Sequence, residues 1–294
     1  MRILVSGSSG FIGSALVPYL TGHGHAVSRL VRKKERDNDI VWDPDRDLLD
    51  SRSLDGFDAV IHLGGVNIAA RRWTTSFKRA IWDSRIRSTE LLVNRVLAVP
   101  RRPQVFICMS AVGYYGDRGN EVLTESSSPG NDFMAQLCVA WEKATQPLAA
   151  RGVRVVNLRT GLVLSAKGGA LKKMLLPFKL GLGGRLGSGN QYWSWIALDD
   201  FVAGVQFILG NSSVAGPVNM VAPNPVTNRE FARILGEALH RPAVFPLPAP
   251  VIRIVFGEMG DSLFLTGQRV TPKTLERSGF QHLYPTLDAA FGRV

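Results

Sequence analysis

The stretch that decides the fold lies near the N-terminus, where residues 2–20 read RILVSGSSGFIGSALVPYL. Residues 2–7 are a short apolar run that ends in glycine, and from Phe11 apolar side chains recur at helical spacing. Gly7, Gly10 and Gly13 lie directly between the two segments. This order predicts a strand, a tight glycine turn and a helix whose first N–H groups can bind a pyrophosphate.

Apolar runs and amphipathic stretches alternate along the rest of the first half of the chain. Runs that are apolar on consecutive positions are typical of parallel strands covered on both faces. The expected strands are residues 26–31, 58–63, 105–110 and 153–158, and the expected helices are residues 76–98 and 132–150. This alternation predicts an α/β fold with a doubly wound parallel sheet of the Rossmann type.

Glycines and aromatic residues become frequent after residue 160. Further helices are expected at 199–209, at 228–240 with Thr227 as N-cap, and as short patches at 251–256 and 271–278. We therefore expect a dinucleotide-binding Rossmann domain over 1–164 and a smaller substrate-side region over 165–294. Part of the sheet and helices of that second region should return to the Rossmann core.

The composition excludes several classes of protein. With 294 residues, 45% hydrophobic and 20% charged, the chain is neither disordered nor collagen-like. Its longest apolar runs, such as 105–109, are far shorter than the roughly 18 residues of a membrane-spanning helix, so we expect no membrane partner. The net charge of +11 is spread over both halves, which favours a solvated mixed surface and no nucleic-acid partner.

The cysteines and histidines indicate neither a disulfide framework nor a metal site. Cys108 and Cys138 lack zinc-site spacing and are expected to be buried reduced thiols. The glycine turn occupies the stretch where a signal peptide would lie, and cleavage there would destroy it. We therefore expect a reducing compartment and a cytoplasmic protein.

The end of the second expected strand favours one form of the cofactor. In Rossmann domains a side chain about 20 residues beyond the glycines contacts the adenosine ribose, an acid for NAD or an arginine for the 2′-phosphate of NADP. Arg32 lies at this position, and residues 30–34 contain no acid. A guanidinium pairs with a phosphate, whereas a carboxylate would be repelled. The sequence favours NADP(H), with a solvated turn at 32–36 as the alternative.

Motifs along the whole chain resemble one enzyme family. The glycine turn, HLGG at 62–65 and SAVGYYG at 110–116 resemble an extended short-chain dehydrogenase/reductase of the NAD(P)-dependent epimerase/dehydratase type. More narrowly, the chain resembles an atypical group of nucleoside-diphosphate-sugar epimerases with its own C-terminal segment. The residues that carry this resemblance are 71–73, 141–142, 176–189, 195–196, 248–250, 257–258 and 267–270.

The resemblance implies a set of contacts to NADP(H). Carried over position by position, the cofactor-binding residues would be Gly7, Ser9, Gly10, Phe11, Ile12, Gly13, Val31, Arg32, Leu63, Gly64, Arg85 and Leu162. Arg85 has an equally simple alternative, a surface arginine on a helix rich in them.

The usual catalytic pair of that family is absent. Short-chain reductases use a tyrosine with a lysine four residues later, and no YxxxK occurs in this chain. If Glu142 aligns with the glutamate that closes the family's catalytic helix, Met134 replaces the tyrosine and Cys138 the lysine. The usual serine position falls on Ala111, next to Ser110.

The catalytic residues are therefore unknown, and only weak candidates are available. They are Ser110, Tyr114 with Arg118 as a charge-assisted partner, and Tyr115; the alternative is that the two tyrosines pack a cleft wall. Two hypotheses remain: an NADP(H)-binding epimerase-like oxidoreductase of an unidentified small molecule, acting as monomer or homodimer, and a catalytically silent NADP(H)-binding regulatory protein.

Overall fold

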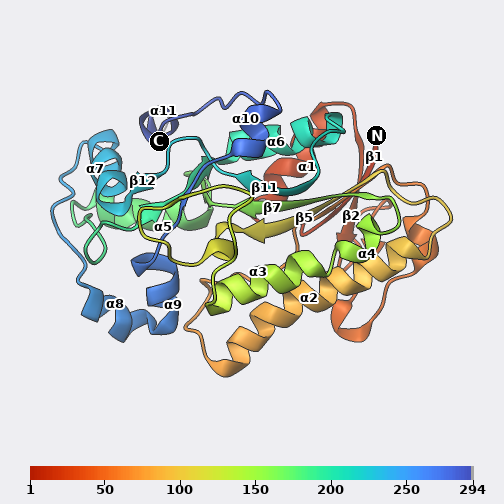
Figure 1. Cartoon of the computed structure of the whole chain (residues 1–294), viewed down its shortest axis with the longest axis horizontal. Coiled ribbons are helices and arrows are strands. Elements are labelled where there is room, and N and C mark those ends of the chain that lie inside the picture. The colour runs from red at the N-terminus through yellow and green to blue at the C-terminus, as the bar shows by residue number, and fades with distance from the viewer. Residues whose placement is uncertain (293–294) are drawn as a thin grey trace.

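A seven-stranded parallel sheet forms the centre of the computed structural model, which describes residues 1–292 (Figure 1). The strands are β1 (Arg2–Ser6), β2 (Ala26–Val31), β3 (Ile40–Val41), β4 (Ala59–His62), β5 (Val105–Ala111), β7 (Arg154–Thr160) and β11 (Gly216–Met220). Their order is β11-β7-β5-β4-β1-β2-β3, and each neighbouring pair is parallel. The predicted α/β fold with a doubly wound sheet is confirmed.

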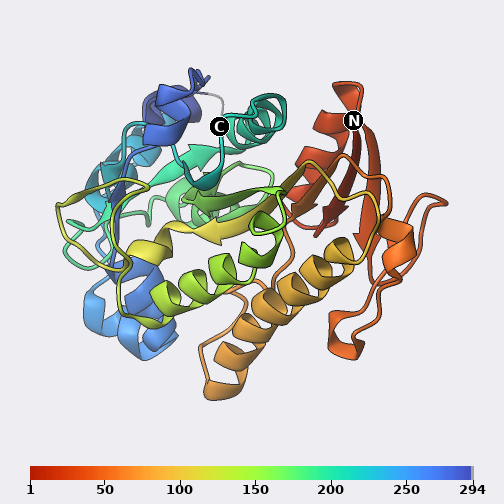
Figure 2. The same cartoon turned by 45° about the vertical axis from the view of Figure 1, so that its right-hand side comes forward.

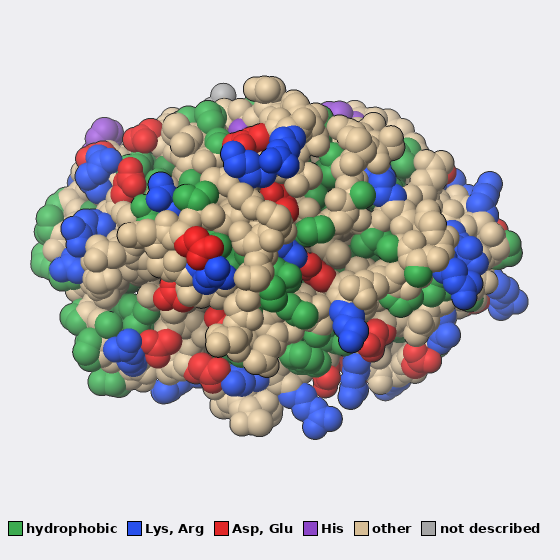
Figure 3. Space-filling model, in the orientation of Figure 1, with side chains coloured by type: hydrophobic (Ala, Val, Ile, Leu, Met, Phe, Trp, Pro, Cys, Tyr) green, Lys and Arg blue, Asp and Glu red, His purple; other side chains and the backbone are tan. Residues whose placement is uncertain are grey.

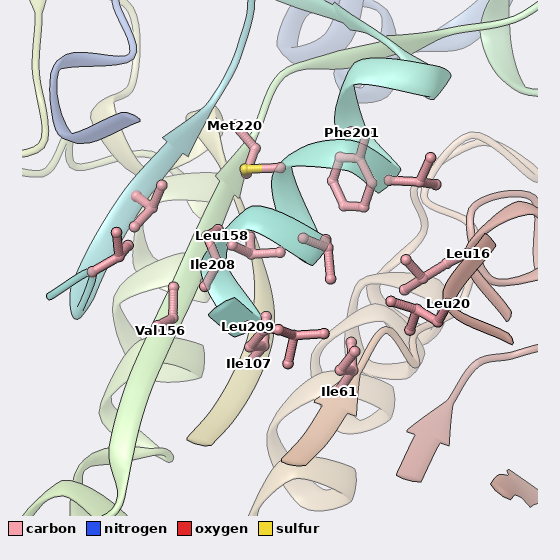
Figure 4. Packing of buried hydrophobic residues seen from close by; sticks show 14 of the residues in the cluster. Leu16, Leu20, Ile61, Ile107, Val156, Leu158, Phe201, Ile208, Leu209 and Met220 are labelled. Carbon is pink, nitrogen blue, oxygen red and sulfur yellow. The ribbon is translucent and has the colours of Figure 1, made fainter. Parts of the chain in front are cut away.

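Two layers of helices cover the sheet (Figures 1 and 2). One face carries α1 (Gly13–Gly22) and α6 (Leu198–Gly210), and the other carries α2 (Thr75–Leu97), α3 (Phe133–Lys143) and α4 (Gln146–Ala149). Successive side chains of a strand point to opposite faces. Accordingly, Ile3 and Val5 of β1 pack in the cluster that contains Leu16 and Leu20 of α1 (Figure 4), whereas Leu4 packs in the cluster of α2.

Shorter elements form the rest of the C-terminal half. The helices are α5 (Gly169–Lys179), α7 (Asn228–Ala238), α8 (Ala249–Phe256), α9 (Glu258–Gly260), a π-helical turn (Asp261–Leu265), α10 (Lys273–Arg277) and α11 (Leu287–Phe291). Three pairs of short strands accompany them: β6 (Val122–Leu123) with β13 (Arg269–Val270), β8 (Leu162–Leu164) with β10 (Trp195–Ala197), and β9 (Tyr192–Trp193) with β12 (Val226–Thr227). Thr227 caps α7, as predicted, by accepting a hydrogen bond from the backbone N–H of Glu230.

Two sequence-based expectations about these elements are wrong or incomplete. Residues 132–150 do not form one helix, because Pro147 has no N–H to donate and the chain breaks between α3 and α4. The strands β3 and β11 were not predicted; β11 contains Pro217 and Asn219, which weaken its apolar pattern. Together, α6 and β11 bring part of the region after residue 164 into the central sheet and its helices, while the division at 164 stays a prediction.

Within residues 1–292, no helix combines the length and the apolar character that crossing a bilayer requires. The same residues contain no group of three His, Cys, Asp or Glu side chains arranged to hold a metal ion.

Candidate functional site

A cavity of about 460 Å³ opens at the carboxyl ends of β1, β2 and β4. The chain runs outward from β1 to β2 and β3, then returns to place β4 on the other side of β1. Ligands of doubly wound proteins bind where the strand order reverses in this way. The cavity is lined by Gly7, Ser8, Ser9, Arg29, Leu30, Val31, Arg32, Lys33, Glu35, Trp42, Pro44, Gly64, Gly65, Val66, Ser84 and Ser88.

Glycines make the turn after β1 compact. Gly7 has a φ of +69°, and a Cβ there would lie 2.9 Å from the carbonyl carbon of Leu63. A Cβ at Gly13 would collide with the carbonyl oxygen of Gly7 and lie 2.7 Å from the Cα of Ser8. At Gly10 a Cβ would meet only the Gly7 oxygen, at 3.2 Å. Gly7 and Gly13 are therefore required by the protein's own backbone, whereas Gly10 leaves space at the start of α1.

Ser8, one of the residues that line the cavity, has an unsatisfied polar atom. Its Oγ is buried and makes no hydrogen bond to any part of residues 1–292. Buried polar atoms in folded proteins almost always have a partner. No side chain caps the start of α1 either. A bound group that carries phosphate oxygens would provide hydrogen-bond acceptors for the Ser8 hydroxyl and for the N–H groups at the start of α1.

A buried histidine supports the loop after β4. The His62 Nδ1 is 2.6 Å from the Oγ of Ser6, and its Nε2 is 3.2 Å from the Oγ of Ser88. Burial, and then the charge of Arg85, lower the pKa of His62 to about 4. The ring is therefore neutral at pH 7 and fixes the base of the cavity through its two serine contacts.

Arg32, the residue predicted to bind the 2′-phosphate, lines the cavity and already has two carboxylate partners. Its Nη1 is 2.7 Å from Asp43 Oδ1 and 3.0 Å from Asp45 Oδ2. Residues 30–34 contain no acid, but Asp43 reaches Arg32 because it follows β3, the neighbour of β2. The Arg32 side chain is 58% exposed, so a phosphate can reach it.

Arg85 lies beside the cavity rather than in its lining. Its Nη2 donates to the carbonyl oxygen of Val66 at 3.1 Å, and its guanidinium stacks 5.1 Å from the ring centre of Trp141. Burial lowers its pKa to about 10, so it stays charged at pH 7. Arg85 is thus partly buried between the loop after β4 and Trp141 of α3, and its contact with a cofactor stays a prediction.

The remaining predicted contacts divide into three groups. Gly7, Ser9, Val31 and Gly64 line the cavity, and Leu63 adjoins it through its contact with Gly7. Phe11 and Ile12 pack against the apolar cluster on the α1 face, where the ring of Phe11 meets the loop at 168–169. Leu162 belongs to β8, pairs with Trp195 and is not among the residues that line the cavity.

A buried ion pair fixes the carboxyl end of β5. Arg159 donates from Nε and Nη2 to the two carboxylate oxygens of Glu142, each at 2.9 Å. Ser110 donates to Glu142 Oε1 at 2.8 Å. Because this hydroxyl is buried and already engaged, the arrangement favours a positional role for Ser110 over proton transfer to a substrate.

The two tyrosines after β5 differ in accessibility. Tyr115 is fully buried, donates to Asn219 Oδ1 at 2.6 Å, and has its pKa raised to about 12 by burial. Tyr114 is partly exposed and packs under the guanidinium of Arg159 at 3.4 Å from its ring centre. The hypothesis that Arg118 is its charged partner is wrong, because Arg118 instead donates two hydrogen bonds to Glu121, each at 2.9 Å.

Helix α3 presents no acid or base at the positions of the missing pair. Met134 is buried and its Cβ lies 3.2 Å from the site of a Cβ on Gly113. Cys138 is also buried, and this burial, aided by the Glu142 carboxylate, raises the thiol pKa to about 12. Both side chains therefore act as packing residues at pH 7.

Family comparison agrees with this geometry. The family model described as NAD dependent epimerase/dehydratase matches residues 3–221, from β1 to the end of β11. The chain belongs to the NAD dependent epimerase/dehydratase family. A second model, a domain of unknown function named DUF1731, matches residues 247–294.

Members of this family with similar sequences cover nearly the whole chain. An epimerase family protein of Mycobacterium bovis is 46% identical over 291 residues, which is 99% of this chain and 96% of that protein. Human epimerase family protein SDR39U1 is 39% identical over 297 residues, 100% of this chain and 99% of the relative. The crystal structure of human SDR39U1 (isoform 2) with NADPH has a TM-score of 0.93 at 37% identity, covering 100% of this chain and 99% of that one.

Several polar residues of this epimerase-family site were missed by sequence reasoning. Ser8 lies inside the glycine motif, so its position was available, but its lack of a partner is visible only in three dimensions. Asp43, Asp45 and His62 are not among the residues that the sequence predicts for the cofactor site. The spacing of these residues along the chain gives no signal, since parallel strands bring them to the site.

Proposed function

We propose that this protein binds NADP(H) in the cavity at the carboxyl ends of β1, β2 and β4. The main support is the buried, unpartnered Oγ of Ser8 beside the uncapped start of α1. The human relative with a TM-score of 0.93 was crystallised with NADPH, which supports the same cofactor here.

Each part of the cofactor has proposed contacts. The pyrophosphate would lie against the turn at 7–13, with Gly7, Ser9, Gly10, Phe11, Ile12 and Gly13. Arg32 would bind the 2′-phosphate, and Val31, Leu63, Gly64 and Arg85 would surround the adenosine and the adjoining riboses. Leu162, which lies outside the cavity lining, is a prediction from the family resemblance alone.

We further propose an epimerase-like oxidoreductase whose substrate is a small molecule with a carbonyl or hydroxyl group. The nicotinamide would accept or donate a hydride at carbon. In this chain Tyr114 is the best-placed proton donor, because its hydroxyl has no hydrogen bond within residues 1–292 and its ring is fixed by Arg159. The alternative, a catalytically silent regulatory protein, is favoured by the buried Met134 and Cys138 in place of a tyrosine and a lysine.

Two experiments test these proposals, the first for the cofactor site and the second for catalysis. Fluorescence titration with NADPH should show binding to the unmodified protein and none to Gly10→Val, whose side chain would fill the space at the start of α1. Gly22→Val is the matched control, because a Cβ at Gly22 meets nothing within 4 Å. Equal binding by the two variants would contradict the placement of the cofactor.

Turnover tests the catalytic part of the proposal. The unmodified protein should oxidise NADPH with at least one member of a panel of aldehydes and ketones, and Tyr114→Phe should slow this reaction by roughly a hundredfold or more. NADPH binding without oxidation by any member of the panel would favour the silent regulatory protein.

The proposal also includes domain division, compartment and assembly. We propose a dinucleotide-binding domain over 1–164 with a substrate-side region over 165–294, cytoplasmic action as monomer or homodimer, and no nucleic-acid partner. The free, buried cysteines Cys108 and Cys138 support a reducing compartment.

A further inference from the structure

Nine large aliphatic and aromatic side chains are exposed on neighbouring segments of the C-terminal half. Three come from the end of α5 and the loop after it, three from the connection before α8, and three from α8 itself. We call this surface the apolar face; it consists of Leu176, Leu180, Leu182, Val244, Phe245, Leu247, Val251, Ile254 and Val255. Contiguous apolar patches of this kind mark interaction sites in soluble domains.

Backbone hydrogen bonds join these segments into one surface. The N–H of Phe245 donates to the carbonyl of Gly183 at 3.1 Å, and the N–H of Leu247 donates to that of Arg185 at 2.9 Å. Arg241 Nε donates to the Lys179 carbonyl at 3.0 Å. The connection 241–248 therefore runs along the loop after α5 and continues directly into α8, and Figure 3 shows hydrophobic side chains gathered over α8 at the lower left.

Helix α8 exposes a stripe rather than scattered residues. Val251, Ile254 and Val255 are spaced by three and four positions, so they share one side of the helix. Ile252 is the buried residue of this helix, and Ile254 is 74% exposed. Such exposure of a β-branched side chain has no explanation in the packing of the described chain.

Positive charge predominates in the segments that carry the apolar face. Residues 165–190 and 238–257 contain seven lysines and arginines and no aspartate or glutamate. Lys172, Lys173 and Lys179 lie on α5 at spacings of three and four from Leu176, on the outer side of the helix, and they make no ion pair within residues 1–292. Of the seven, Arg253 is neutralised, by Asp261 at 2.8 Å.

This composition decides between three kinds of occupant. A second copy related by a two-fold axis would bring together two faces whose segments carry lysines and no acid, so these lysines would gain no counter-charge. A protein partner is disfavoured because protein interfaces are enriched in Trp, Tyr and Arg and depleted in Lys, whereas this face has one Phe, no Trp or Tyr, and free lysines. Aliphatic side chains flanked by lysines match a bilayer surface with anionic headgroups.

We propose that the apolar face docks on the surface of an anionic lipid bilayer. Val251, Ile254 and Val255 would lie between the headgroups, and the lysines of α5 would contact their negative groups. This is surface association, so it requires no spanning helix.

Flotation with lipid vesicles tests the proposal on the full-length protein. The protein should float with vesicles of equimolar phosphatidylserine and phosphatidylcholine, and not with phosphatidylcholine alone. Each basic side chain near an anionic surface strengthens binding about fivefold, so Lys172→Glu with Lys173→Glu and Lys179→Glu should weaken it by roughly a hundredfold or more. The exposed triple variant Val251→Ser, Ile254→Ser, Val255→Ser should also lose flotation while keeping its fold.

A variant with charge reversals outside the apolar face tests for a general charge effect. Lys143→Glu with Arg151→Glu alters two exposed basic side chains at α3 and α4, outside the apolar face, and should float like the unmodified protein. Absence of flotation with the anionic vesicles at low salt, or equal loss in this control, would overturn the proposal. So would light scattering that finds a dimer which the triple serine variant converts to monomer, since the face would then be a contact between copies.

Discussion

The stability of the fold should fall between pH 6.5 and 4 because of one buried histidine. His62 is fully buried between Ser6 and Ser88, and its pKa is lowered from 6.5 to about 4. In this window the unfolded chain binds a proton at His62 and the folded chain does not. Protonation therefore favours unfolding as the pH falls. The shift of about 2.5 pH units corresponds to about 3 kcal/mol, of which about 2 kcal/mol is lost between pH 7 and 4.5.

Urea unfolding measured at intervals from pH 7 to 4.5 checks this expectation. His62→Gln keeps a polar side chain but cannot titrate. From pH 7 to 4.5 its free energy of unfolding should therefore fall by about 2 kcal/mol less than that of the unmodified protein. His282, whose pKa is also lowered by burial, contributes with the same sign, and His282→Gln provides the matched comparison. Parallel pH curves for the unmodified protein and His62→Gln would refute the reasoning.

Three substitutions test other parts of the site. Gly13→Ala should destabilise the fold by about 1 to 3 kcal/mol in urea unfolding, because its Cβ collides with the preceding turn, and unchanged stability would contradict the described turn. Asp45→Asn should strengthen NADPH binding about two- to fivefold in a fluorescence titration by releasing Arg32, and weaker binding would assign Asp45 a different role. Glu142→Gln should cost about 3 kcal/mol or more because it leaves Arg159 buried without its counter-charge, and the double variant with Arg159→Met should recover part of this loss.

The sheet and the glycine turn could be predicted because their signals are local. The apolar run of residues 2–7, the glycines after it and the helical spacing beyond depend on neighbouring residues, and they predicted β1 and α1 closely. By contrast, β11 lies in the sheet because five of its residues pair in parallel with residues of β7. Its own sequence, which contains Pro217 and Asn219, does not reveal this pairing.

The charged part of the site depends on tertiary contacts that spacing cannot reveal. Arg32 meets Asp43 only because β3 lies beside β2. Tyr114 packs on Arg159 from β7. Arg118, which is nearer to Tyr114 in sequence, instead donates hydrogen bonds to Glu121, three residues further along the chain. The absence of YxxxK was readable directly, since it requires only residue identities, and the structure adds that Met134 and Cys138 are buried.

Calorimetric titration of the unmodified protein and Arg32→Ala with NADPH and NADH tests the central claim most directly. The unmodified protein should bind NADPH roughly tenfold more tightly than NADH, because an exposed guanidinium shared with two carboxylates contributes about 1.4 kcal/mol to the 2′-phosphate. Arg32→Ala should lose this preference and keep its affinity for NADH. No detectable binding of either nucleotide, or an unchanged preference in Arg32→Ala, would contradict the account.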